Sequence, residues 1–293
     1  MQSDAQVNKG LVTGEYGRHF EQLPAEACEQ ACCGIDYSIA MAGRLALQRM
    51  TEHYGGGYPE YAPGNEVSFA AHNGLHGREV GVASERMGTE LGLRSPYLLL
   101  ARATGEAHDA ILTDGGGVKL QRGEMEDQTA IFFGKLLRAQ GVDEELVAAG
   151  ELGVLGTKNV LSDEGLLIGQ VVSTMNFPSK SAEDMAMSVA CADMAGAYSR
   201  RGPLNCLEYY KELRGIQAHE AAAFESGELA GHYRYEQRFL EAYAFPHPVG
   251  ETLFGKDRAR LNDFYQQTAD ALQAGAIESW AQLQEHAEAY ARA

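Results

Sequence analysis

The chain of 293 residues has 41 acidic and 24 basic side chains, a formal net charge of −17 at pH 7, and 45% hydrophobic residues. This length and apolar content are enough for one large domain or two small ones, each with its own core. The negative charge repels polyanions, and no cluster of Lys and Arg interrupts it. We therefore expect neither nucleic-acid polymers nor anionic membranes as partners, whereas a small anion could bind at a local cation or metal.

The sequence has no uncharged apolar stretch long enough to span a bilayer, and its first residues, MQSDAQVNKG, lack the apolar region of a secretory leader. We therefore expect a soluble, cytoplasmic protein. Its cysteine count is odd, and Cys28, Cys32 and Cys33 stand together in CEQACC without the second half of a zinc pattern. Buried, reduced thiols on a helix are the expectation for this cluster.

Apolar residues recur at three- and four-residue steps along most of the chain, which predicts an all-α fold. The first such pattern runs from Leu23 to Tyr54 and stops at three glycines, and a second covers about 66–92. A third begins near Ser95, an acceptable N-cap followed by Pro96, and ends near residue 111. Further helices are expected at about 125–140, 144–155, 164–174, 182–198, 205–226, 233–243 and 257–291. No strand alternation competes with these helical patterns.

The segment FPHPVG, residues 245–250, is flanked by prolines and is the best candidate for a domain boundary. The helix before it could equally pack on the main body. We therefore expect an N-terminal tail (1–22), a helical core (23–226) and a C-terminal helical extension (227–293), and we leave open whether this extension packs on the core.

Histidine and aspartate residues stand in three separate helical patterns. His72 and His76 are four residues apart in AAHNGLHGREV, a spacing that places both on one face of a helix. His108 and Asp109 are adjacent near the end of the apolar pattern LLLARATGEAHDAIL, and Asp193 lies among small residues in MSVACADMAGAY. Such groups need a partner, because burying an unpaired charge is costly. Imidazole and carboxylate ligands suit Mn²⁺, Fe²⁺, Co²⁺, Ni²⁺ or Zn²⁺.

The order of these residues resembles the HD superfamily of metal-dependent phosphohydrolases, which is named for its adjacent His-Asp pair. HNGLHGREV is similar to the HNxxHxxxV helix of that superfamily, LLIGQVVSTMNFP to the segment before its last aspartate, and ACADMAGAY to the helix that carries this aspartate. The resemblance covers roughly residues 60–215. It implies an HD helical bundle in which His76, His108, Asp109 and Asp193 bind one divalent transition-metal ion.

The HNxxH form resembles the cyclic-nucleotide phosphodiesterases in particular, whose first histidine is a proton donor and whose second binds metal. The resemblance implies that His72 protonates the leaving alkoxide, while a water activated by the metal attacks phosphorus and Asp109 belongs to the catalytic set. A histidine near the start of a helix is the alternative for His72. Asn73 either orients a ligand or supports the start of the helix.

Two departures from the superfamily narrow what the resemblance implies. Leu112 stands three positions after Asp109, where the diesterases have a further histidine and several nucleotidases and alarmone hydrolases have a glutamate. Asp114 could substitute for it, but an aspartate before three glycines is also explained by turn chemistry. No histidine occurs between Asp109 and Asp193, which argues against a histidine-supported second metal and against oxygenase chemistry.

A substrate phosphate needs cations besides the metal. Arg78, Lys119, Arg122 and Lys158 are candidates by their proximity to the motifs, although a lone basic side chain is usually a solvated surface charge.

We therefore expect a mononuclear, metal-dependent phosphohydrolase of a small phosphate ester, with a nucleotide-like diester as one candidate substrate. Two alternatives stay open: a ligand-binding or regulatory protein that keeps the HD scaffold without turnover, and a metal-dependent hydrolase or lyase of a non-phosphate substrate. The oligomeric state, a homo-oligomer included, is undetermined.

Overall fold

The structure is a computed structural model that describes residues 33–54, 71–114, 119–121, 123–198, 202–214 and 223–292. Helices make up most of these residues, and the sheet found among them has two strands. The expected all-α class is therefore confirmed. Within the described ranges, no helix is both long enough and apolar enough to cross a membrane. The expectation for the thiols of Cys28 and Cys32 falls outside the described residues.

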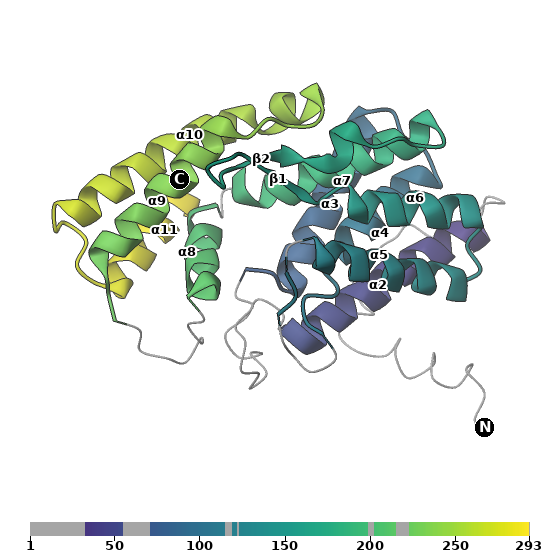
Figure 1. The fold of residues 1–293 in the computed structure, drawn as a ribbon, viewed down its shortest axis with the longest axis horizontal. Helices are drawn as coiled ribbons and strands as arrows, with labels where there is room; N and C mark the ends of the chain where they lie inside the picture. The colour runs from purple at the N-terminus through teal and green to yellow at the C-terminus, as the bar shows by residue number, and fades with distance from the viewer. Residues whose placement is uncertain are drawn as a thin grey trace.

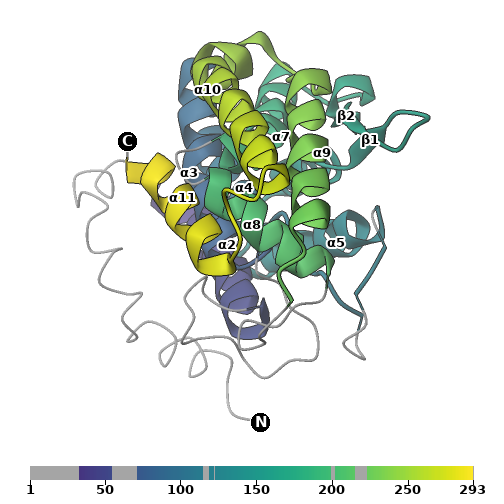
Figure 2. The same ribbon diagram turned by 90° about the vertical axis from the view of Figure 1, so that its left-hand side faces the viewer.

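The helices follow the order that the apolar patterns predict. They are α2 (Cys33–Tyr54), α3 (Gly74–Glu90), α4 (Tyr97–Ala107), α5 (Glu124–Ala139), α6 (Glu144–Leu155), α7 (Lys180–Tyr198), α8 (Gly202–Leu213), α9 (Ser226–Ala242), α10 (Pro248–Gln273) and α11 (Trp280–Arg292). In Figure 1, α2, α4, α5 and α6 lie on one side of the molecule and α8 to α11 on the other. Figure 2 looks onto the side formed by α8, α10 and α11.

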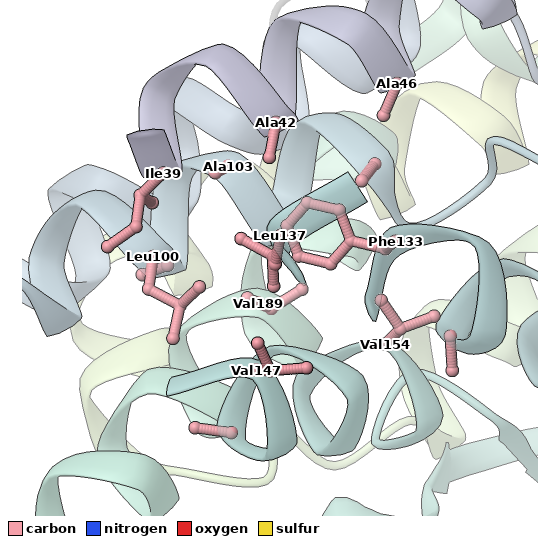
Figure 3. Packing of buried hydrophobic residues seen from close by; sticks show 14 of the residues in the cluster. Ile39, Ala42, Ala46, Leu100, Ala103, Phe133, Leu137, Val147, Val154 and Val189 are labelled. Atoms are coloured by element: carbon pink, nitrogen blue, oxygen red, sulfur yellow. The ribbon is translucent and has the colours of Figure 1, made fainter. Parts of the chain in front are cut away.

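A first hydrophobic core lies between α2, α4, α5, α6 and α7. Figure 3 shows its packing, in which each of these helices contributes at least one completely buried side chain: Ile39, Leu100, Phe133, Val147 and Val189. Burying a side chain of this size contributes roughly 1.5–3 kcal/mol. The core holds α4 and α7 against each other, and these two helices carry the HD pair and Asp193.

A second hydrophobic core joins α8, α9, α10 and α11, with Tyr233 and Tyr265 among its largest buried side chains. Met87 of α3 and Cys191 of α7 belong to the same cluster, and α10 packs directly on α7 and α3. Helix α7 therefore takes part in both cores. Helix α8 precedes the predicted boundary at residue 226 and shares this core with α9 to α11. The predicted domain bounds stay a prediction.

The segment predicted as a helix over 164–174 instead holds the turn and the second strand of a β-hairpin and a short 3₁₀ helix, so this part of the sequence prediction was wrong. Strands β1 (Asn159–Leu161) and β2 (Leu167–Gln170) pair antiparallel, and the short 3₁₀ helix η4 (Val171–Thr174) follows. The reason is the turn between the strands. Gly165 has a φ of +76°, and the backbone N–H of Ser162 donates to the carbonyl of Leu166, which reverses the chain.

Several predicted helix bounds also differ. The pattern over 257–291 is divided into α10 and α11, because Gly275 has a φ of +70° and ends the first helix. The pattern over 205–226 gives a helix that ends at Leu213. Ser95 does not cap α4, since its hydroxyl donates to the side chain of Asp36 on α2.

Helices α3 and α4 approach each other so closely that only glycine fits at their contact. A Cβ atom on Gly105 of α4 would lie 2.5 Å from the hydroxyl of Ser84 and 3.0 Å from both the Cα of Gly81 and the carbonyl oxygen of Val80 on α3. The backbone atoms cannot move aside as a flexible side chain would. This contact sets the distance between His76 on α3 and the HD pair at the end of α4.

We expect Gly105→Ala to destabilise the protein by about 1–3 kcal/mol, because the overpacking outweighs the better helix propensity of alanine. Gly231→Ala is the matched control. Gly231 lies within α9, and a Cβ there meets nothing within 4 Å, so alanine should stabilise by up to about 1 kcal/mol. Urea denaturation measures both changes. A Gly105→Ala protein as stable as the wild type would contradict the close approach.

Candidate metal centre

Four side chains from three helical segments converge at one point. His76 lies on α3, His108 is the C-cap residue of α4 and is followed by Asp109, and Asp193 lies on α7. The Nε2 atom of His108 is 3.1 Å from Oδ2 of Asp109 and 3.2 Å from Oδ1 of Asp193. The Nε2 atom of His76 is 3.5 Å and 3.7 Å from the same two oxygens. The tertiary structure therefore brings together all four ligands that the resemblance implied.

The two separations from His108 match those between neighbouring ligands of one metal ion, and the two from His76 are slightly longer. Two ligands about 2.1 Å from an ion are about 3.0 Å apart at a right angle and about 3.4 Å apart at the tetrahedral angle. One ligand atom each from His76, His108 and Asp109 lies within 4.8 Å of the others, and Asp193 stands beside this group of three, with its Oδ1 3.2 Å from Nε2 of His108. Two imidazoles and two carboxylates form a nitrogen and oxygen donor set that suits a divalent transition metal.

The hydrogen bonds of His108 determine which of its ring nitrogens carries a proton. Nδ1 lies 2.8 Å from the carbonyl oxygen of Gly105, which can only accept, so Nδ1 is the donor. Nε2 is buried and makes no hydrogen bond within the described residues, although two carboxylate oxygens are its neighbours. A neutral ring would direct its lone pair at these oxygens. That arrangement is repulsive unless a cation, either a proton on Nε2 or a metal ion, lies between them.

The charges of the four groups shift one another's pKa values. Burial lowers the pKa of His76, but the nearby carboxylates of Asp109 and Asp193 raise it more, to about 9. Burial also lowers the pKa of His108, but the charges of Asp109 and Asp193 raise it more, so that this pKa lies well above its usual value. Burial raises the pKa of Asp109, yet the charge of His108 holds it well below the usual range. Without a metal, protons therefore supply the positive charge that the carboxylates require.

Gln170 is a residue of this site that the sequence did not indicate. It lies at the end of β2, and its side-chain Nε2 donates to Oδ2 of Asp193 at 2.8 Å. The other carboxylate oxygen, Oδ1, is the one that faces His76 and His108. The only sign of this role in the sequence was one glutamine in a segment predicted to be helical, and one such residue does not indicate a site.

Glu212 of α8 is a second residue that the sequence did not indicate, and it holds His72. Its side chain is fully buried, and Oε1 lies 2.8 Å from Nδ1 of His72 and 2.7 Å from Nζ of Lys119. Its Oε2 accepts the backbone N–H groups of Ala71 and His72, both at 3.1 Å. Burial raises the pKa of Glu212, but the charges and hydrogen bonds of His72 and Lys119 lower it by more, so that the pKa is about 2.

His72 precedes α3 instead of lying on it, contrary to the helical pattern. Asn73 is the N-cap, because its side chain accepts the backbone N–H groups of Leu75 and His76. Asn73 therefore supports the start of the helix, which was one of its two predicted roles. The ring of His72 still meets that of His76 edge to face, with centroids 5.8 Å apart.

The candidate ligands open into a cavity of about 360 Å³. Three of them line it together with His72 and Lys119, and further lining residues come from α8 and α9, among them Tyr209, Tyr235 and Phe239. Glu126 of α5 also lines it. Burial raises the pKa of Glu126, and the nearby charges of Asp109 and Asp193 raise it as well. The cavity is within the size range of sites for small organic ligands.

Other predicted substrate-binding residues lie away from the cavity. Arg78 is half-buried on α3 and does not line it. Asp114 is exposed and does not line it either. Lys158 donates to Asp127 at 2.6 Å, and Arg122 lies outside the described residues. Among the predicted cations within the described ranges, Lys119 is therefore the one that reaches the cavity.

Comparisons of the chain with protein-family models, with curated proteins and with solved structures found no match. The chemistry of the site therefore has to be argued from its own geometry.

Metal uptake should release protons and strengthen as the pH rises. The raised pKa values of His76 and His108 mean that both rings are protonated near neutral pH, and a metal must displace these protons to reach the nitrogens. Titration calorimetry of Mn²⁺ or Zn²⁺ in two buffers of different ionisation enthalpy measures the release, which we expect to approach about two protons per ion near pH 7. An affinity independent of pH between about 6 and 9 would contradict this arrangement.

Proposed function

We propose that the protein is a metal-dependent phosphohydrolase of the HD type, which acts on a small phosphate ester. His76, His108, Asp109 and Asp193 would hold one divalent ion, with Mn, Fe, Co, Ni or Zn as the candidates. The observation that carries the proposal is the convergence of these four donors beside a cavity, with a buried histidine nitrogen that makes no hydrogen bond within the described residues.

A divalent ion, when bound, lowers the pKa of a coordinated water and offsets negative charge on phosphoryl oxygens. The chain supplies what surrounds that chemistry. The two carboxylates Asp109 and Asp193 balance the charge of one divalent ion, so further positive groups are needed to hold a phosphate. Lys119, which also pairs with Glu212 at 2.7 Å, is the predicted cation within the described ranges that lines the cavity.

His72 is the proposed proton donor to the leaving group. Glu212 binds its Nδ1, so the opposite ring nitrogen, Nε2, is the one that can give a proton to a substrate in the cavity. Burial lowers the pKa of His72, but the charge of Glu212 and the hydrogen bond to it raise the pKa above the usual value. This shift favours the protonated ring, which is the form in which a general acid acts.

The remaining cavity wall supports a small organic substrate. Tyr209 lies next to His72, with ring centroids 6.0 Å apart, and Tyr235 and Phe239 extend the aromatic lining along α9. Aromatic side chains offer large apolar faces to the non-phosphate part of an ester. A nucleotide-like ester is one compound of suitable size and shape.

Purified protein supplied with divalent metal should hydrolyse a generic aryl phosphodiester or its monoester counterpart, and the ratio of the two rates assigns the subclass. His76→Ala and Asp193→Ala should each lose at least about 100-fold in activity, together with bound metal. Elemental analysis measures the metal. Two variants with full metal content and full rate would refute the site. A metal-loaded wild type inactive on both esters would favour a non-phosphate substrate or a regulatory protein.

His72→Ala should keep its metal but lose about 10²–10⁴-fold in kcat, because it lacks the proton donor. Glu212→Gln tests the same assignment through pH. A proton donor is active below its pKa, and Glu212 raises the pKa of His72, so this variant should move the alkaline limb of the kcat profile to lower pH. Full activity of His72→Ala would instead favour the alternative, a histidine near the start of the helix without a catalytic role.

A further inference from the structure

We infer that helix α9 controls the affinity of the metal centre through a buried relay of hydrogen bonds, in which Tyr243 holds Gln170 and Gln170 holds Asp193. The inference rests on the proposed metal centre but not on the reaction that occurs there. It assigns to the C-terminal helices a role in metal binding, in addition to their packing.

The relay consists of two hydrogen bonds of ordinary length, one between buried groups and one to the partly buried Asp193. The hydroxyl of Tyr243 donates to Oε1 of Gln170 at 2.9 Å, and Nε2 of Gln170 donates to Oδ2 of Asp193 at 2.8 Å. The same amide nitrogen lies 3.4 Å from the carbonyl oxygen of Thr157. Gln170 is 3% exposed and Tyr243 is 2% exposed. The amide therefore has every polar group matched, in one orientation only.

The orientation of the amide determines how Asp193 can bind a metal. Because Gln170 presents an N–H group to the carboxylate, it favours the ionised form of Asp193 and occupies Oδ2. Oδ1 is left to face Nε2 of His108 at 3.2 Å. The relay thus holds Asp193 as a ligand through one oxygen, already rotated toward the centre before an ion arrives. Preorganisation of this kind raises affinity, since less order is lost on binding.

Tyr243 is itself held firmly. It is the C-cap residue of α9, and its ring packs on Phe239 one turn earlier, with centroids 5.5 Å apart. Its carbonyl accepts a hydrogen bond from Arg258 of α10 at 3.1 Å. Phe239 also lines the cavity. Helix α9 therefore lines part of the cavity through Phe239. Through Tyr243 and Gln170 of the β-hairpin, it also contacts Asp193, the proposed metal ligand.

The test measures metal affinity directly, by competition of Mn²⁺ or Zn²⁺ against a chromogenic chelator, with the full chain. Gln170→Leu removes the amide with little change in volume and should raise the Kd by about 10- to 100-fold. Tyr243→Phe removes only the hydroxyl, one bond further from the ligand, and should raise the Kd by about threefold to tenfold.

Tyr233→Phe is the matched control. Tyr233 lies on the same helix and is completely buried, but its hydroxyl has no hydrogen-bond partner among the described residues. Removing that hydroxyl should leave the Kd for metal unchanged. The comparison separates the relay from a general loosening of α9, which both tyrosine variants would share.

An unchanged Kd in Gln170→Leu or in Tyr243→Phe, with wild-type circular dichroism, would overturn the inference. Equal losses in Tyr233→Phe and Tyr243→Phe would also overturn it. If Gln170→Leu does not fold, Tyr243→Phe decides alone. A wild type that takes up no metal would refute the metal centre together with the relay, whereas metal uptake without phosphate-ester hydrolysis would refute only the proposed reaction.

Discussion

Two carboxylates and two imidazoles meet where His108 is buried and the other three side chains are less than one fifth exposed, and the rest of the structure is arranged around this electrostatic constraint. Asp109 and Asp193 cannot both be ionised in such a place without a positive charge between them, because unpaired buried charge is costly. His76 and His108 supply that charge as protonated rings, and a metal ion, as proposed, would take its place. Nε2 of His108 makes no hydrogen bond among the described groups, so one buried polar atom of the four side chains is left unmatched.

The packing of the helices allows this arrangement to form. The glycine contact between α3 and α4 places His76 beside the HD pair, and α7, shared by both hydrophobic cores, adds Asp193 from a third direction. The cavity has walls from helices of both cores. Polar groups that cannot be buried in either core thus gather where the two cores adjoin. Preorganised sites depend on this kind of support from rigid elements.

The local pattern was enough for some elements and not for others. The helix predicted over 144–155 is found with the same bounds as α6, because its apolar residues match the helical period throughout. The segment over 164–174 is also apolar, but the turn at Gly165 and pairing with β1 override its helical period. Short apolar runs are ambiguous in this way, because the two kinds of structure bury similar residues.

The sequence by itself determined the all-α class and the order of His76, His108, Asp109 and Asp193, because helical periodicity and the spacing of these groups are local properties. Only the tertiary structure decided which residues support them. Glu212 binds His72 from 140 positions away, and Gln170 binds Asp193 from a hairpin that the apolar pattern had indicated as a helix. Such contacts leave no periodic signal, since they depend on where separate helices cross. The folded chain thus adds the carboxylate of Glu212, which orients His72, and the amide of Gln170, which orients Asp193.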